Sequence, residues 1–283
     1  MDFGPKSVID VRARGLRWLD HYVRGEQNGA DAEPPVEIFT MGANVWRSEA
    51  AWPPPHTLPT KFFLHSNGRA NTAQGDGTLS SASPDDEPPD NYDYDPADPI
   101  PTTGGGTCCN PVLIPWGAMD QRRIENRKDV LIYTSSPLEA DIEVTGPVEV
   151  RLFASSSAPD TDWTAKLVDV APDGFAMNLT DGILRARFRK SFARPELLNP
   201  GKVYEFVVQA GNTSNVFRKG HRIRLEISSS NSPRFSRNTN TGRQPEKDAG
   251  FSVARQTVYH DRARPSSVIL PVRRGADYSA VAK

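Results

Sequence analysis

The adjacent pair Cys108 and Cys109 is the first candidate for chemistry, because the chain has no other cysteine and the pair opens the proline-containing stretch CCNPVLIPWG (108–117). Zinc sites need ligands spaced so that four of them can close a tetrahedron, and two adjacent cysteines do not match that spacing. Neighbouring Cα atoms lie ~3.8 Å apart across a trans peptide, which is shorter than the ~4.4–6.8 Å span of an ordinary disulfide. We therefore expect a reduced pair in a rigid loop, with a structural rather than a redox role.

Serine and histidine residues are the second candidates, since together with a carboxylate they form hydrolytic triads. An α/β-hydrolase presents its nucleophile on a sharp strand-to-helix turn with the pattern G-x-S-x-G, and the sequence contains no such pentapeptide. None of the histidines has a sequence context that identifies a general base, so we interpret each as a surface or hydrogen-bonded structural residue. They are His21, His56, His65, His221 and His260.

Three polar stretches could bind ligands. The acidic stretch 84–99 could bind calcium, but its spacing is not that of an EF-hand and prolines interrupt it, so we expect a solvated loop. The segment TTGGG (102–106) is not followed by a lysine or by the start of a helix, which argues against a phosphate loop. Polar loops together with Trp163 or Phe235 could line a sugar site, although similar loops cap most sandwiches. The carboxylates of the acidic stretch are Asp85, Asp86, Glu87, Asp90, Asp93, Asp95 and Asp98.

The N-terminal part of the chain has the pattern of predicted elements that is typical of an α/β unit. Apolar residues at helical spacing predict an amphipathic helix over 7–24, with Ser7 as N-cap and Gly25 as stop. The stretch 36–42 predicts a buried strand, and the helix-then-strand order suggests a parallel sheet whose other strands are not nearby in the sequence.

From residue 57 onward, alternating patterns predict a β domain. Strands are expected in 61–66, 148–156, 163–171, 203–210, 221–229, 251–260 and 266–272, and a long irregular segment covers 67–119. Many such strands without helical patterns between them indicate a mainly β chain with a two-sheet sandwich or jelly roll. We therefore divide the chain into an incomplete α/β unit (1–56) and a β-sandwich (57–283).

Charge and hydropathy limit the partners. The 34 basic and 35 acidic residues give a net charge of −1, so no positive surplus favours nucleic acid or anionic lipid. No apolar run approaches the ~20 residues of a membrane span, and the N-terminus shows no secretory signal pattern. Two cysteines cannot form a disulfide framework, which favours a reducing compartment such as the cytoplasm.

Several longer stretches resemble the X-prolyl dipeptidyl-peptidase and cocaine esterase family of α/β-hydrolases. The C-terminal domain of that family is similar to residues 131–189, which begin with LIYTSSPLEADIEVTGPVEVRLFASSS, to NVFRKGHRIRLEISSSNSPRFSRNTNTG (215–242) and to ARQTVYHDRARPSSVILPV (254–272). The stretches GLRWLDHYVRGEQNG (15–29) and VEIFTMGANVWRSEAAWPPP (36–55) resemble the last helix and strand of its catalytic domain. The resemblance implies a jelly-roll, galactose-binding-like domain that braces a serine hydrolase and helps to wall its pocket, with Trp116 packed at the domain junction.

The resemblance also implies that the catalytic Ser, Asp and His precede this helix. No catalytic, cofactor-binding or metal-ligating residue can then be assigned in this chain, His21 included, and we expect the chain alone to be inactive. The expected partner is an upstream α/β-hydrolase half, in cis or as a separate chain, or a second copy, because Trp18, Leu19 and Ile38 would otherwise expose apolar surface. The alternative is a free-standing carbohydrate-binding jelly roll.

Overall fold

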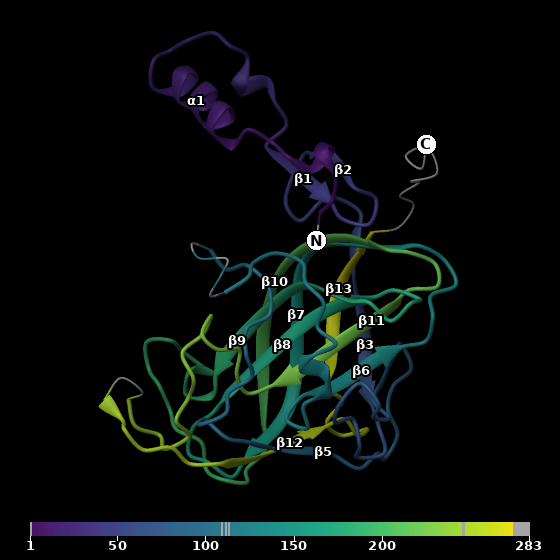
Figure 1. The fold of residues 1–283 in the computed structure, drawn as a ribbon, viewed down its shortest axis with the longest axis vertical. Helices are drawn as coiled ribbons and strands as arrows, with labels where there is room; N and C mark the ends of the chain where they lie inside the picture. Colours follow the sequence, from purple (N-terminus) through teal and green to yellow (C-terminus); the bar gives the residue numbers. More distant parts are fainter. Residues whose placement is uncertain (1, 109, 111, 113, 245–246, 274–283) are drawn as a thin grey trace.

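A computed structural model describes residues 2–108, 110, 112, 114–244 and 247–273. Most of these residues form a β-sandwich, from which an N-terminal helix and hairpin project (Figure 1). No helix among the described residues is long and apolar enough to cross a membrane. The short 3-10 helices found in this described part of the chain are η1 (Pro5–Ser7), η2 (Ala30–Ala32), η3 (Ile124–Asn126) and η4 (Ala186–Phe188).

The sandwich strands of the described chain are joined by hydrogen bonds in the order β5-β12-β7-β13-β3-β4-β6-β11-β8-β9, and β10 pairs with β7. Most pairs are antiparallel, and β4 with β6 is a parallel exception. The strands are β3 (Thr57–His65), β4 (Thr78–Ser80), β5 (Asp90–Tyr94), β6 (Leu131–Ser135), β7 (Ile142–Ser156), β8 (Asp162–Val170), β9 (Ala176–Arg185), β10 (Tyr204–Phe217), β11 (Arg222–Ser228), β12 (Ala254–Tyr259) and β13 (Ser267–Arg273).

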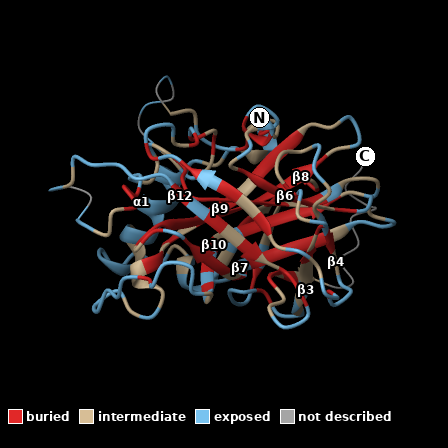
Figure 2. Cartoon of the chain, turned by 90° about the horizontal axis from the view of Figure 1, so that it is seen from below, coloured by how far each residue is buried: buried red, intermediate tan, exposed pale blue. Residues whose placement is uncertain are grey.

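The hydrophobic core lies between the two layers that this folded sheet forms (Figure 2). In β7 the side chains of Val148, Val150 and Leu152 are fully buried, as the alternating pattern predicts. Trp163 of β8 packs against Phe206 of β10 with ring centroids 5.6 Å apart, so aromatic contacts join the two faces. The prediction of a mainly β sandwich is therefore confirmed.

Each predicted sandwich strand overlaps a strand of the structure, but the pattern missed others. The segment 67–119 is irregular for most of its length and contains the short strands β4 and β5. Strand β9 was missed because polar residues and Gly182 interrupt its pattern. A Cβ on Gly182 would lie 2.0 Å from the backbone oxygen of Gln209, so the glycine is needed where β9 approaches β10.

The predicted N-terminal helix is shorter than expected. Helix α1 spans Val11–Tyr22, and its N-cap is Asp10, whose carboxylate accepts from the Ala13 N–H at 2.9 Å. The prediction that Ser7 is the N-cap is wrong, because Ser7 ends η1 and its hydroxyl donates to the Gly4 carbonyl. None of the α1 side chains is buried.

The strand predicted at 36–42 does not join a parallel sheet in the described chain. Strand β1 (Val36–Thr40) pairs antiparallel with β2 (Val45–Glu49), because Gly42 and Asn44 adopt positive φ angles of 77° and 57° and turn the chain back. The hairpin lies against β10, where Met41 and Asn215 form a bridge. Ile38 is consequently only 8% exposed, which corrects the expectation that it presents apolar surface.

Candidate functional site

The part of the chain described by the structure brings Ser66, Glu87 and His260 into the connectivity of a hydrolytic triad. The Glu87 carboxylate lies 3.1 Å from Nδ1 of His260, and Nε2 of His260 lies 3.1 Å from Oγ of Ser66. Ser66 follows β3, Glu87 precedes β5, and His260 follows β12. The site therefore depends on three strands that are distant in sequence.

Asp90 changes the chemistry of this constellation. Its Oδ2 lies 2.9 Å from His260 Nε2 and accepts the hydroxyl protons of Ser66 at 2.7 Å and Tyr133 at 2.8 Å. Its Oδ1 accepts the Ala70 backbone N–H at 2.8 Å. The Ser66 proton is thus directed to a carboxylate, so His260 is not placed as the base that removes it.

The central residues of this cluster are buried. Asp90 and His260 have no exposed surface, and Ser66 is also buried. Burial opposes ionisation of Asp90, but hydrogen bonds from His260, Ala70 and Ser66 outweigh it and lower the pKa of the carboxyl. Burial also lowers the pKa of His260, but the hydrogen bonds and charges of Asp90 and Glu87 together outweigh burial, so the net pKa is raised. His260 is held between two carboxylates and is closed to substrate, so we interpret this cluster as a structural junction.

Sequence reasoning missed this junction. The acidic stretch was expected to be a solvated loop, and that prediction is wrong for Asp90 because β5 carries it into the core. The signal was the alternation in 90–94, where Asp90, Tyr92 and Tyr94 are buried and the residues between them are not. His65 joins the same cluster, with Nδ1 2.7 Å from the Glu87 carboxylate.

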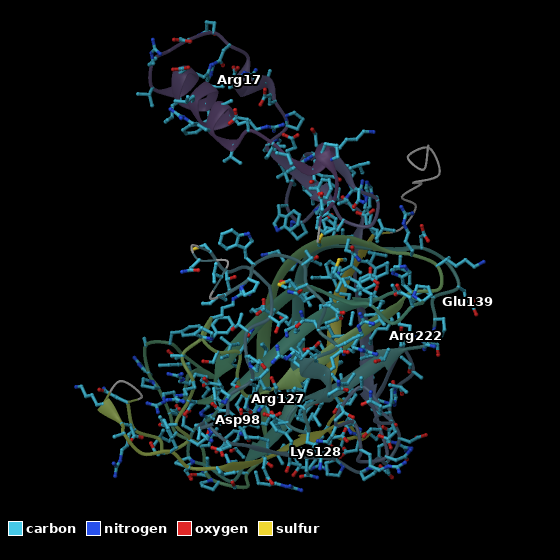
Figure 3. All side chains as sticks on the ribbon, viewed as in Figure 1. Arg17, Asp98, Arg127, Lys128, Glu139 and Arg222 are labelled. Carbon is cyan, nitrogen blue, oxygen red and sulfur yellow. The ribbon has the colours of Figure 1, made fainter. Side chains whose placement is uncertain are left out.

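A polar groove of about 780 Å³ lies beside β5. In Figure 3 the labelled side chains Asp98, Arg127 and Lys128 mark it on the sandwich. Arg127 is paired within the groove, with Asp98 at 3.1 Å and Asp129 at 2.8 Å. The described residues contain no group of three or more His, Cys, Asp or Glu side chains arranged to hold a metal ion.

The loop at the cysteine pair differs from the prediction in the redox state of Cys108. Cys108 is disulfide-bonded, so the expectation of a reduced thiol is wrong for this residue, and Cys109 lies outside the described residues. The prediction relied on strain, which makes a disulfide easier to reduce but does not set its redox state. Gly105 and Gly117 pair at the base of the loop, and Trp116 is 46% exposed. Its packing at a domain junction stays a prediction.

The two aromatic residues considered for a sugar site lie in different environments. Trp163 is fully buried in the core and cannot serve as a stacking platform. Phe235 lines a hollow of about 370 Å³ together with Phe251 and Arg237, whose guanidinium lies 4.4 Å from the Phe251 ring centroid. The sugar hypothesis therefore retains one of its two residues.

The helix α1 carries the largest exposed apolar side chains of the N-terminal part. Trp18 is 54% exposed and Leu19 is 47% exposed, and the Trp18 ring packs at a tilt against Tyr22 with ring centroids 4.6 Å apart. The helix stands away from the sandwich (Figure 1). This surface is unusual for a free-standing monomer.

The hairpin below α1 is fixed to the sandwich by charge. Arg47 donates two hydrogen bonds to the Glu143 carboxylate, at 2.6 and 3.1 Å, and Glu143 is buried. On the same hairpin, the Thr40 hydroxyl lies 3.0 Å from that of Ser214 in β10. A bidentate guanidinium–carboxylate pair defines an orientation as well as an energy.

The chain is similar to known proteins over most of its length. Residues 28–269 match the family model of the X-Pro dipeptidyl-peptidase C-terminal non-catalytic domain. Cocaine esterase from Rhodococcus sp. (strain MB1 Bresler) is 44% identical over 259 residues, which are 90% of this chain and 44% of that protein.

Two solved structures have similar folds. An alpha-amino acid ester hydrolase superposes with a TM-score of 0.77 at 28% identity, covering 91% of this chain and 44% of the other. An aminopeptidase from a marine sediment Thaumarchaeota archaeon gives a TM-score of 0.75 at 29% identity, covering 92% and 43%. The chain thus spans less than half the length of each of these relatives.

Proposed function

This chain belongs to the family of X-Pro dipeptidyl-peptidase C-terminal non-catalytic domains. From that premise we propose that it is the scaffolding and pocket-shaping part of a serine hydrolase, and that the whole enzyme cleaves acyl esters or X-prolyl peptides. The family match over most of the chain is the observation that carries the proposal. On this view residues 1–56 close an α/β-hydrolase domain and residues 57–283 form the sandwich that braces it.

The absence of a usable nucleophile is part of the proposal. Catalysis of this type needs an activated serine, a base and an oxyanion hole at one accessible place. The constellation of Ser66, Glu87 and His260 contains a serine and a histidine, but both of these residues are buried and the Ser66 hydroxyl donates to Asp90. This arrangement supports the proposal that the chain alone does not hydrolyse esters.

Labelling with a fluorophosphonate probe tests this point. We expect no stoichiometric adduct on the isolated chain, because Ser66, the serine that the described residues place beside a histidine and a carboxylate, is buried and donates to Asp90. A Ser66→Ala variant serves as the control. An adduct that disappears in Ser66→Ala would show that the buried constellation opens and acts, and it would contradict the proposal.

The partner is the second part of the proposal. The apolar surface of α1 supports docking to an upstream α/β-hydrolase half, in cis or as a separate chain, or association between copies. Sedimentation velocity of the chain and of a double variant, Trp18→Ser with Leu19→Ser, tests it. We expect the parent chain to associate and the variant to sediment as a monomer, whereas a monomeric parent that also fails to bind the upstream half would contradict docking.

Activity should then depend on that half. Ester hydrolysis is expected only when the upstream coding region is expressed with this chain. The hollow at Phe235 favours the alternative, a carbohydrate-binding module. Saturable glycan binding by the isolated chain that is lost in Phe235→Ala would support that alternative instead.

A further inference from the structure

A second hollow, separate from the buried junction, lies where the N-terminal segment and the β1–β2 turn meet the ends of β8 and β10. Its volume is about 320 Å³, at the lower end of the range for small-molecule sites. Much of its wall is apolar, and Phe3, Phe175, Met177 and Val216 contribute to it. The turn residue Gly42 has no side chain to fill the space, and a Cβ there would lie 2.2 Å from the Val216 carbonyl oxygen.

One imidazole in this wall is held in a fixed orientation. The Asp169 carboxylate lies 2.8 Å from Nδ1 of His221, and its other oxygen accepts from the Asn215 amide at 3.1 Å. Asp169 and Asn215 are buried, whereas the His221 side chain is 25% exposed. Because Nδ1 is committed to Asp169, Nε2 is the ring nitrogen left for a ligand.

The charges around the hollow select the kind of ligand. Asp169 and Asp2 place negative charge at its wall. Arg218 is already used, since it bonds to Asp141 at 2.7 Å and to the Gly42 carbonyl at 2.8 Å. This arrangement disfavours anions. In the neutral imidazole whose Nδ1–H donates to Asp169, the lone pair of Nε2 accepts a hydrogen bond, so a neutral ligand has to donate one.

We propose that this hollow binds a small aromatic alcohol, whose hydroxyl donates to Nε2 of His221 while its ring packs against Phe175 and Met177. The acceptor supplies specificity for the hydroxyl, and the apolar wall supplies most of the contact area. The proposal does not depend on the hydrolase function, because every residue that it uses is in this chain.

Titration with 4-fluorophenol, observed by fluorine NMR, tests the proposal, with fluorobenzene as the probe that lacks the donor. The informative variant is His221→Asn, because the asparagine amide can still donate to Asp169 but nothing replaces Nε2. The matched control is His56→Asn, since His56 lies in a turn outside the hollow and its φ of 70° suits asparagine.

We expect saturable 4-fluorophenol binding with a dissociation constant below ~10 mM. We expect His221→Asn to weaken it about fivefold, as for the loss of one hydrogen bond. Binding of fluorobenzene should stay within about twofold in all variants, because its contacts are apolar. The proposal is overturned by no saturable phenol binding, by an equal loss for both probes, or by the same affinity in His221→Asn.

A second measurement protects the test against a variant that misfolds. In the parent chain labelled with ¹⁵N-histidine, 4-fluorophenol should shift the Nε2 resonance of His221 and leave that of His56 unchanged. Equal shifts at both histidines, or none at His221, would place the probe elsewhere and contradict the proposal.

Discussion

Replacing Asp90 by asparagine should be among the most damaging single-atom changes in the chain. The carboxylate accepts hydrogen bonds from Ala70, Ser66 and Tyr133 and pairs with His260, all within 2.9 Å. Asparagine can keep the bond from Ala70, but its NH₂ group then faces donors at the other oxygen position. Removing one partner of a buried ion pair costs about 3–5 kcal/mol, because the remaining charge is left without compensation.

The pH dependence identifies the cause of this loss. The pKa of Asp90 is lowered from 3.8, so its contribution is present above that value and disappears as pH falls through the folded pKa. The pKa of His260 is raised from 6.5, so its contribution is present below that value and disappears as pH rises through the folded pKa. The difference between parent and Asp90→Asn should therefore be largest between about pH 4 and 6.5 and smaller on either side.

Urea unfolding followed by far-ultraviolet circular dichroism across this pH range measures the effect. For a chain of this size, the expected loss of unfolding free energy in Asp90→Asn corresponds, in thermal unfolding, to a fall in Tm of about 6–20 °C. The matched control is Asp93→Asn on the same strand, because Asp93 is 59% exposed and pairs with Arg255 at the surface. The control should change stability by less than about 0.5 kcal/mol. A loss below about 1 kcal/mol for Asp90→Asn, or one independent of pH, would refute a buried ion pair at this junction.

Four further substitutions test other parts of the structure. Burial raises the pKa of Glu226 to about 7 from 4.5, so ionisation of this carboxyl opposes folding and the parent should lose unfolding free energy as the pH rises from about 4.5 to 7. Urea unfolding of Glu226→Gln should lack that loss, and an identical pH profile would contradict it. Gly182→Ala should cost at least about 1–3 kcal/mol, because its Cβ meets backbone. Gly15→Ala in open space on α1 should instead stabilise by up to about 1 kcal/mol in thermal unfolding, and similar effects at both sites would refute this reasoning. Arg47→Lys loses the fork to Glu143 and should lower the opening free energy of the hairpin by about 1–2 kcal/mol in hydrogen exchange, while unchanged protection of β1 and β2 would exclude that role.

The sandwich could be predicted from sequence where one face of a strand is buried and the other is not. Strand β7 shows this clearly, because Val148 and Val150 alternate with the more exposed Glu149 and Arg151. Strand β8 was predicted from the same kind of alternation, but every one of its residues is buried, so its polar residues do not mark an exposed face. Strand β9 is largely buried on both faces and carries polar residues, and it was not predicted.

The polar junctions could not be predicted, because they depend on contacts between segments that are far apart in the chain. Asp90 and His260 are separated by 170 positions, and a single sequence gives no measure of which carboxylate meets which histidine. The same holds for Asp169 and His221, which are 52 positions apart. Charged residues in a β pattern were interpreted as solvated, and that rule fails where burial and pairing occur together.

The distribution of paired charge within the described chain favours a bracing role for the sandwich. Asp160 with Arg187, and Glu125 with Arg224, join a buried carboxylate to a largely buried arginine at 2.8 and 2.6 Å. Such pairs are costly to bury and costly to break, so they favour one rigid arrangement of the strands and loops that they join. The large apolar side chains of α1 have no comparable cover, since none of its residues is buried. The surface that most needs a partner is therefore on the helix and not on the sandwich loops, and this asymmetry supports a scaffold for a neighbouring domain over a module that works alone.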